Sequence, residues 1–296
     1  MRLLACLLLL NLVASAMGAD TISVMCFNLR GDFDGGVATD KPDGWLQKSG
    51  AHRRDLALNV VRDADPDLLG VQEAYRNQIE ELDAALPGHA FYGVGREDGA
   101  EEGEHSAIYY RRERFEPLDS GTLWLSNTPD KPSLYPGAAC RRIASWVVLR
   151  DKAQAASRDG GSPLGELLVL NTHWDHVSDE ARRHSGAMIA ERLPELAEGR
   201  AAIVMGDLNA TEETPALAAL RDGPVPLVDS YRAAHPQRND DERTFHGFRG
   251  GDQGSRIDFI LHSDRLKTTG AEILRTDDDG VYPSDHYPVT AELAPR

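Results

Sequence analysis

Short apolar segments separated by polar turns recur along most of the chain. The spacing predicts strands at residues 21–28, 68–71, 91–95, 106–111, 122–125, 143–149, 167–170, 201–205, 257–261 and 287–293. Apolar positions at helical spacing predict helices at 53–62, 75–86 and 178–193, and Thr214-Pro215 predicts the start of a short one. Runs of strands with few long helices favour an α/β (α+β) four-layer sandwich. Two mainly antiparallel sheets would pack face to face, with the helices on the outside.

The first nineteen residues have a different pattern from the rest. Arg2 is followed by a Leu/Ala/Val run and then by small residues, which is typical of a secretory signal peptide cleaved after Ala16 or Ala19. We therefore expect a secreted or periplasmic protein. Residues 20–296 contain no repeat or long linker, so we expect them to form one domain. No later segment is a candidate transmembrane helix.

Charge narrows the range of partners. The formal net charge of −16 gives no generic attraction to nucleic acid or acidic lipid, but it suits a site that holds a divalent cation. We expect a monomer without a stable protein partner or membrane insertion. A Cys26–Cys140 disulfide is the less favoured possibility, because both look like strand residues and the sequence does not give their separation.

Polar side chains gather where predicted strands end. The apolar run 201–205 is followed by Gly206, Asp207 and Asn209. Acid, amide or imidazole groups have comparable positions beside other predicted strands: Asn28, Glu73, His173, Asp258, Asp285 and His286. Crowded carboxylates need a counter-charge, and oxygen ligands favour Mg²⁺, Mn²⁺ or Ca²⁺ over zinc. A metal, a histidine base and amide donors together suit attack of water on phosphorus.

Six motifs carry a resemblance to a known family. "MCFNLR", "GVQEA", "NTHWDH", "GDLNA", "RIDFIL" and "SDHYPV" stand in the order found in the endonuclease/exonuclease/phosphatase superfamily, which has the deoxyribonuclease I-like fold. The resemblance covers about residues 21–293. It implies that Glu73 is the main metal ligand, with Asn28 beside it and Asp285 near the ion. His286, held by Asp258, would activate water or stabilise the attacked phosphate.

The resemblance also implies roles for the remaining polar groups. Asp207 would orient the nucleophile or donate a proton, and Asn209 would bond a phosphoryl oxygen. His173 would contact the phosphate from the opposite side, paired with Glu104. Arg30 stands where abasic-site endonucleases of the superfamily carry an Asp, which argues against a repair role.

Substrate contacts are expected from residues near these motifs. The candidates are Arg30, Glu104, Trp174 and His246, the last within a long loop at 238–256. Arg141 and Arg142 are expected to form ion pairs rather than to meet a substrate phosphate.

The predicted function is an exported Mg²⁺- or Mn²⁺-dependent hydrolase of a phosphoester, with a small or single-stranded substrate favoured over a long duplex. Two alternatives stay open. Asn171-x-His173-x-Asp175-His176 is similar to the first zinc motif of metallo-β-lactamase-like hydrolases. The second alternative is a non-catalytic binding protein that has kept the fold.

Overall fold

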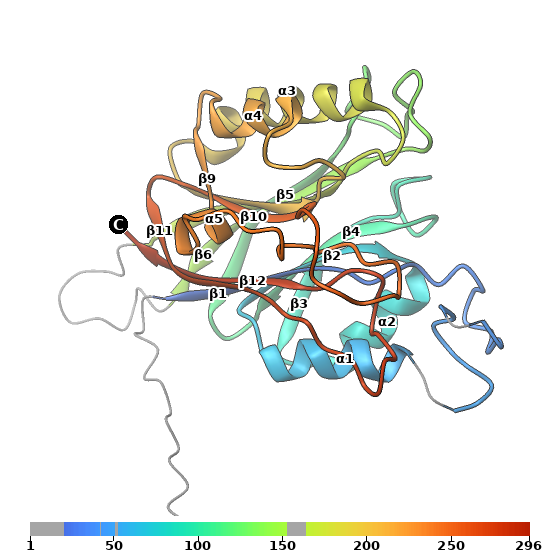
Figure 1. The fold of residues 1–296 in the computed structure, drawn as a ribbon. Helices are drawn as coiled ribbons and strands as arrows, with labels where there is room; N and C mark the ends of the chain where they lie inside the picture. The colour runs from blue at the N-terminus through green and yellow to red at the C-terminus, as the bar shows by residue number, and fades with distance from the viewer. Residues whose placement is uncertain (1–20, 42, 51–52, 153–163) are drawn as a thin grey trace, which may run out of the picture.

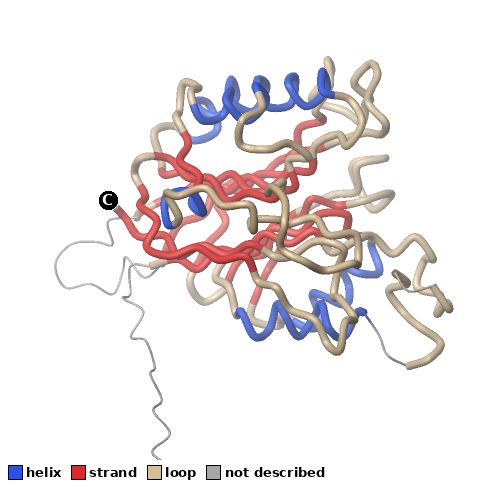
Figure 2. The backbone as a smooth tube through the Cα atoms, in the orientation of Figure 1, coloured by secondary structure: helices blue, strands red, loops and turns tan. Residues whose placement is uncertain are grey.

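The computed structural model describes residues 21–41, 43–50, 53–152 and 164–296. Two six-stranded sheets pack face to face, and helices cover their outer faces (Figures 1 and 2). The predicted sandwich is therefore confirmed. The predicted signal peptide lies outside the described residues. None of the described helices is long and apolar enough to cross a membrane.

The two sheets have similar strand orders. The first sheet runs β11 (Leu266–Ile273), β12 (Val289–Pro295), β1 (Ile22–Asn28), β2 (Leu68–Ala74), β4 (His105–Arg111) and β3 (His89–Tyr92). The second runs β5 (Phe115–Trp124), β6 (Ile143–Asp151), β7 (Glu166–His173), β8 (Ala201–Asp207), β10 (Asp258–Ser263) and β9 (Leu227–Asp229). Each sheet has one parallel pair, β1 with β2 and β7 with β8, and its other neighbours are antiparallel.

Helices cover the two outer faces of the sandwich. Helices α1 (Arg53–Ala64) and α2 (Arg76–Ala85) lie on the first sheet, and α3 (Asp179–Ala197) and α4 (Pro215–Arg221) lie on the second (Figure 1). The short α5 (Ser230–Ala234) sits at one end. Thr214 caps α4 by accepting from Leu217 N, as its sequence predicted. Helix α3 continues through Pro194, a turn farther than predicted.

Three apolar layers hold the sandwich together. The middle layer, between the sheets, contains Val24, Leu68, Val147, Val169 and Ile203. The other two join each sheet to its helices. Removing this apolar surface from water is the main stabilising contribution to the fold.

One polar residue crosses the middle layer just below the site. Asn171 on β7 donates to Val71 O at 2.9 Å and to Ala107 O at 2.8 Å, and accepts from Gln72 Nε2 at 2.6 Å. A Cβ at Gly70 would lie 2.8 Å from Met205 Cε and 3.0 Å from the Asn171 amide carbon, so the glycine leaves room for this close approach. Asn171 thereby fixes how the two sheets are placed relative to each other.

Several elements differ from the sequence-based prediction. Strands β9 and β11 and helix α5 were not predicted, and β5 is longer than its predicted counterpart. The two cysteines are free, so the disulfide is absent from the described residues. Cys26 is buried in β1, whereas Cys140 lies in the loop before β6 rather than in a strand.

Candidate active site

The ends of the central strands open onto a cavity of about 580 Å³. Its lining includes most of the expected site residues, namely Arg30, Glu73, Glu104, His173, Asp207, Asn209, Asp285 and His286. Asn28 and Asp258 do not line the cavity, but they bond directly to residues that do. The structure therefore brings residues from both sheets to one place.

Strand pairing places Asp207 between two other residues of the site. His173 on β7 and Asp258 on β10 are the direct strand partners of Asp207 on the two sides of β8. Gly206 turns the chain here with φ of 155°, and a Cβ at this position would lie 2.0 Å from Thr172 O. Only glycine permits this backbone, which presents the Asp207 carboxylate between His173 and Asp258.

Asp207, Asp258 and His286 form a buried charged group. His286 Nδ1 lies 2.9 Å from Asp258 Oδ2, and His286 Nε2 lies 3.6 Å from Asp207 Oδ2. Burial favours the neutral imidazole, but Asp258 and Asp207 outweigh it and raise the pKa of His286 to about 10. Burial, followed by repulsion from Asp258, raises the pKa of Asp207 to about 7.

Asn28 joins the metal-ligand candidates differently from the prediction. Its Nδ2 donates to Glu73 Oε1 and to Asp207 Oδ2, each at 3.0 Å. Its Oδ1 accepts from Arg30 N at 2.9 Å, which fixes the orientation of the amide because a backbone N–H must meet an oxygen. Asn28 therefore positions two carboxylates in this arrangement, and its role as a metal ligand stays a prediction.

Three residues of the site have left-handed backbones without being glycine. They are Arg30 with φ of 56°, Glu73 with φ of 61° and Asn209 with φ of 46°. Such conformations cost about 1–3 kcal/mol each and persist where surrounding contacts impose them. Their concentration around the cavity supports a functional role for these strand ends.

His173 is held neutral at the wall of the cavity. Its Nε2 lies 3.0 Å from Asn209 Nδ2 and 3.4 Å from Asp207 Oδ2. Glu104 Oε2 is 3.8 Å from His173 Nδ1, so the expected pair is close but not hydrogen-bonded. Burial and the nearby Arg142 and Arg96 hold the pKa of His173 well below its usual range. The neutral ring accepts from Asn209 Nδ2 through Nε2.

Glu73 and Asp285 are the candidate ligands of a divalent cation. Both offer hard oxygen atoms. Glu73 also belongs to a group with His173 and Asp207 whose ligand atoms all lie within 4.8 Å of one another. Burial first, and then Glu73, raise the pKa of Asp285 above its ordinary value, which indicates too little positive charge nearby. Arg30 supplies part of this positive charge, because its Nη1 lies 3.9 Å from Glu73 Oε2 and 3.8 Å from Asp285 Oδ2.

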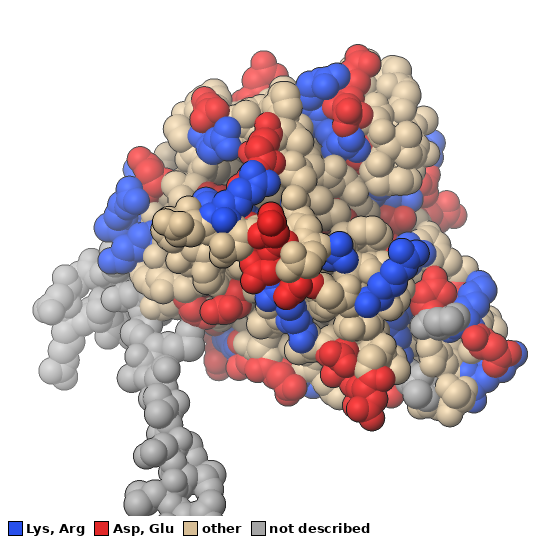
Figure 3. All heavy atoms as spheres, viewed as in Figure 1, with Lys and Arg blue, Asp and Glu red and all other residues tan. Residues whose placement is uncertain are grey.

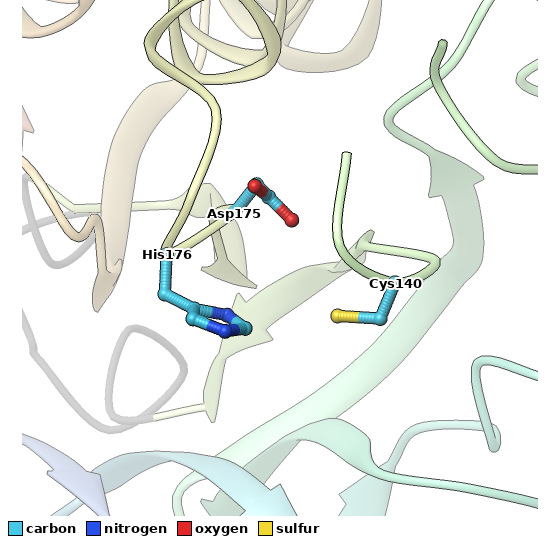
Figure 4. Close-up of side chains that lie close together, drawn as sticks. All are labelled: Cys140, Asp175 and His176. Carbon is cyan, nitrogen blue, oxygen red and sulfur yellow. The ribbon is translucent and has the colours of Figure 1, made fainter. Parts of the chain in front are cut away.

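Beyond Glu104 the cavity wall becomes basic. Arg96, Cys140, Arg142 and His176 line this part. Cys140, His176 and the neighbouring Asp175 point toward a shared space (Figure 4). Existing hydrogen bonds of Asp175 and His176 argue against a zinc ion there. Asp175 already accepts from Ala139, Val177 and Ser178 N, and His176 Nδ1 accepts from Arg142 Nη2 at 2.9 Å.

Two expected substrate contacts are not at the cavity. Trp174 has no exposed surface and packs in the apolar layer under α3, and His246 is 4% exposed between Tyr282 and Tyr287. Each follows a residue that does line the cavity, His173 and Phe245. Consecutive side chains of an extended chain point to opposite sides, so these two turn inward. Both substrate-contact predictions are therefore wrong.

Exposed aromatic rings at the cavity were missed by sequence reasoning. Phe245 is 48% exposed and lies against the His286 ring with centroids 5.0 Å apart. Phe33 is 54% exposed and packs edge-on against Tyr75. Both come from loops, where no periodic pattern marks them. They give the cavity mouth two apolar surfaces for the organic part of a ligand.

A buried arginine that joins the loops beside Glu73 was also missed. Arg53 on α1 has no exposed surface and donates to Leu29 O at 2.5 Å, Arg30 O at 2.9 Å and Pro283 O at 3.1 Å. Burial lowers its pKa to about 10, so it stays charged at neutral pH. Arg53 therefore ties the segment after β1 to the segment that carries Asp285 and His286.

A larger cavity lies elsewhere, but its arginines are paired with carboxylates. It has a volume of about 720 Å³ beside α4 and β9. Its arginines are already paired, Arg232 with Glu212 and Glu242 and Arg238 with Glu212 and Glu213. The smaller cavity at the strand ends therefore remains the candidate active site.

The fold and this constellation define a class of enzyme. The sequence matches the Endonuclease/Exonuclease/phosphatase family over residues 25–286, and the chain belongs to that family. The family consists of phosphoester hydrolases, so the zinc-dependent metallo-β-lactamase alternative is wrong. No curated protein sequence matches the chain.

Solved structures of the same family resemble the whole domain. An endonuclease/exonuclease/phosphatase from Bacteroides vulgatus is 31% identical with a TM-score of 0.80, covering 93% of this chain and 99% of that one. A mannosyl-6-phosphatase from Bacteroides thetaiotaomicron is 34% identical with a TM-score of 0.78, covering 92% and 99%. The human Nocturnin catalytic domain, at 18% identity, TM-score 0.70 and 95% coverage of both chains, shares the fold.

Proposed function

We propose that the protein is a Mg²⁺- or Mn²⁺-dependent phosphoesterase that hydrolyses a small phosphorylated compound. The observation that carries the proposal is the convergence of Glu73, Asp207 and His286 on one cavity at the ends of strands from both sheets. A divalent cation held by Glu73 and Asp285 would neutralise negative charge on the phosphoryl oxygens. Side chains of the protein would stabilise the attacked phosphate and accept the proton of the attacking water.

His286 suits stabilisation of the attacked phosphate better than proton abstraction. Its pKa of about 10 keeps the ring protonated at neutral pH, and Nδ1 is occupied by Asp258. The charged ring therefore donates from Nε2 toward a phosphoryl oxygen. On the opposite wall Asn209 Nδ2 donates to His173 Nε2 and to Trp174 O, so Asn209 positions the neutral His173 ring.

Asp207 is the candidate for moving the proton of the attacking water. Burial and Asp258 raise its pKa to about 7, close to the value at which a general base works best near neutral pH. Asn28 Nδ2 holds its Oδ2 at 3.0 Å, which orients the carboxylate. We therefore assign Asp207 to accept a proton from the water whose oxygen forms the new bond to phosphorus. The bond from phosphorus to the leaving oxygen breaks, and the leaving alkoxide takes up one proton, so the products are the phosphate and the free alcohol.

A phosphorylated sugar is the first substrate to test. The 34% identical structure is named as a mannosyl-6-phosphatase, and its match covers nearly all of both chains. Exposed Phe33 and Phe245 offer apolar surface to a sugar ring. On the face shown in Figure 3, Lys and Arg side chains are interspersed with Asp and Glu and form no continuous basic track. This arrangement gives little support for binding a long duplex.

Export is part of the proposal and rests on residues 1–19 alone. Their apolar run and small-residue cleavage region support delivery to the periplasm or the outside of the cell. Fractionation of the host cells, followed by mass spectrometry of the N-terminus, would test this point. A mature chain that starts at Met1 in the cytoplasm would contradict it.

The activity is tested with a substrate panel. Release of phosphate or nitrophenol would be measured with mannose 6-phosphate, p-nitrophenyl phosphate, bis-nitrophenyl phosphate, RNA and plasmid DNA, each with Mg²⁺ or with EDTA. The proposal expects Mg²⁺-dependent hydrolysis of small monoesters that is lost in His286→Ala. His184→Ala on α3, whose ring stacks on Tyr135 and does not line the cavity, is the matched control.

Two results would redirect the assignment. Hydrolysis that survives both EDTA and His286→Ala would remove the proposed chemistry. Binding of a phosphoester without turnover of any substrate would favour the alternative of a non-catalytic protein that keeps the fold.

A further inference from the structure

The cavity extends past the residues to which the proposed chemistry is assigned. From Asp207 the wall continues to His173 and then to Glu104, whose Oε2 lies 3.8 Å from His173 Nδ1. The same oxygen is 3.7 Å from Arg142 Nη1. Arg96, Arg142 and His176 therefore form a basic end of the cavity, separated from the catalytic group by one carboxylate.

Arg142 in this basic end has two nitrogen atoms without a hydrogen-bond partner in the described residues. The residue is 6% exposed, and its one hydrogen bond is from Nη2 to His176 Nδ1 at 2.9 Å. Its Nε and Nη1 are buried, and neither has a hydrogen-bond partner within the described chain. The nearest carboxylate, Glu104, is already bonded by Arg96 Nη1 at 2.5 Å. The ion pair that the sequence predicted for Arg142 is therefore incomplete.

A buried cation with unfilled donors is costly. Leaving one such group unpaired costs about 1–3 kcal/mol, and more when the group is charged. Arg96 pairs with both Glu104 and Glu97, so the unfilled donors at this end of the cavity belong to Arg142. An oxyanion is the ligand that fills them best, because a guanidinium binds carboxylate and phosphate oxygens strongly, often through two parallel bonds.

We propose that Arg142, with Arg96 beside it, binds a second oxyanion of the substrate, either a phosphate or a carboxylate. This proposal rests on the proposed function, because the first phosphate must lie at Glu73, Asp207 and His286. The second oxyanion belongs to the alcohol that leaves, so the preferred substrate class is a sugar phosphate carrying another negative group. His176, whose Nδ1 accepts from Arg142 Nη2, positions the guanidinium.

The test uses three substrates with similar carbon skeletons. Glucose 6-phosphate has no second oxyanion, 6-phosphogluconate adds a carboxylate and glucose 1,6-bisphosphate adds a phosphate. We expect a higher kcat/KM for at least one of the latter two than for glucose 6-phosphate, chiefly through a lower KM. Which of the two gains more identifies the oxyanion as carboxylate or phosphate.

The variant Arg142→Gln removes the charge and keeps part of the side-chain volume. We expect it to lower kcat/KM for the preferred doubly anionic substrate by about 10- to 100-fold, the range expected for hydrogen bonds to a charged group. The loss with glucose 6-phosphate should be at least tenfold smaller. Arg142→Lys should restore part of the activity, and it replaces Arg142→Gln in every comparison if the latter does not fold.

Arg141→Gln is the matched control. This neighbouring residue does not line the cavity and is half-exposed, with an ion pair to Glu97. The change should leave the preference among the three substrates as it is in the wild type. An equal loss of preference in Arg141→Gln would contradict the assignment to Arg142.

Binding without turnover provides the second readout. Calorimetry of glucose 1,6-bisphosphate and 6-phosphogluconate with EDTA-treated protein should show at least tenfold weaker binding to Arg142→Gln for the preferred ligand. Equal affinities in wild type and variant, or an equal loss of kcat/KM on all three substrates, would overturn the proposal. Failure of the wild type to hydrolyse any phosphoester would contradict the proposed function. The calorimetric comparison would still decide whether Arg142 in the basic end binds an oxyanion.

Discussion

Asp258 Oδ2 lies 2.9 Å from His286 Nδ1, and both side chains are buried at the edge of the cavity. This bond fixes the imidazole so that Nε2 faces Asp207 and the space for substrate. It also explains why a buried histidine keeps its charge, because Asp258 offsets the unfavourable effect of burial. The orientation and the charge of His286 thus have the same source.

Replacing Asp258 with Asn should remove the charge on His286. We expect the pKa of His286 to fall from about 10 and kcat to drop by about 10²- to 10⁴-fold, because the phosphate loses a charged donor. NMR titration of the His286 ring and phosphate-release kinetics would measure the two effects.

The control for this change is Asp264→Asn, an exposed position just beyond the other end of β10. It should leave both quantities near their wild-type values. A protonated His286 in Asp258→Asn at pH 9, together with normal kcat, would show that Asp258 has no such role.

Replacing Arg53 with Met should destabilise the protein and loosen the metal-ligand loops. The carbonyls of Leu29, Arg30 and Pro283 would each lose a donor, at about 1–3 kcal/mol apiece, so we expect the free energy of unfolding to fall by about 3 kcal/mol or more. Urea unfolding would measure this change. Calorimetric titration should show weaker Mg²⁺ binding, because Arg53 holds the segment that carries Asp285.

Arg62→Met, an exposed change on the same helix, should alter the free energy of unfolding by about 0.5 kcal/mol at most. Arg53→Lys should give an intermediate value. Wild-type Mg²⁺ affinity in a folded Arg53→Met protein would contradict the positioning role.

Asp175 should make stability depend on pH in the acid range. Burial alone would raise its pKa, but bonds from Ser178, Ala139 and Val177 N hold the pKa below the ordinary value of 3.8. A carboxylate with a lowered pKa stabilises the folded state above the unfolded pKa, and this contribution disappears as the pH falls through the folded pKa.

The variant Asp175→Asn should therefore be less stable than wild type by about 2 kcal/mol at pH 7, with a difference that shrinks below about pH 4. Urea unfolding between pH 3 and 7 would follow the difference. Asp179→Asn, at an exposed position on the first turn of α3, serves as the control. A stability difference independent of pH would exclude the ionic contribution of Asp175.

The sandwich could be predicted from the sequence because its central strands carry a strong local signal. Runs such as 201–205 are apolar throughout, since they are covered on both faces, and each ends at a polar group. Strand β11 gives a weaker signal, because exposed residues such as Lys267 and Glu272 alternate with small ones at a sheet edge. Its position depends on pairing with β12, which is a tertiary contact.

The site could be predicted in part for the same reason. Glu73 and Asp207 stand at the ends of β2 and β8, and His286 lies in the short segment before β12, so apolar runs in the sequence mark all three positions. Alternation along the chain could have excluded Trp174, which follows the cavity-lining His173. The roles of Arg53 and Arg142 depend on backbone carbonyls and missing partners contributed by distant segments. No local pattern in the sequence records such contacts.

The most direct test of the account is a Mg²⁺ titration of phosphate release by the wild type and by Glu73→Gln. The account predicts that wild-type activity on a hydrolysed sugar phosphate rises with Mg²⁺ and is abolished by EDTA. In Glu73→Gln we expect at least tenfold weaker dependence on Mg²⁺ and a kcat lower by about 10²-fold or more, because a hard anionic ligand is lost. Equal Mg²⁺ curves for a folded Glu73→Gln protein and the wild type would contradict the central claim.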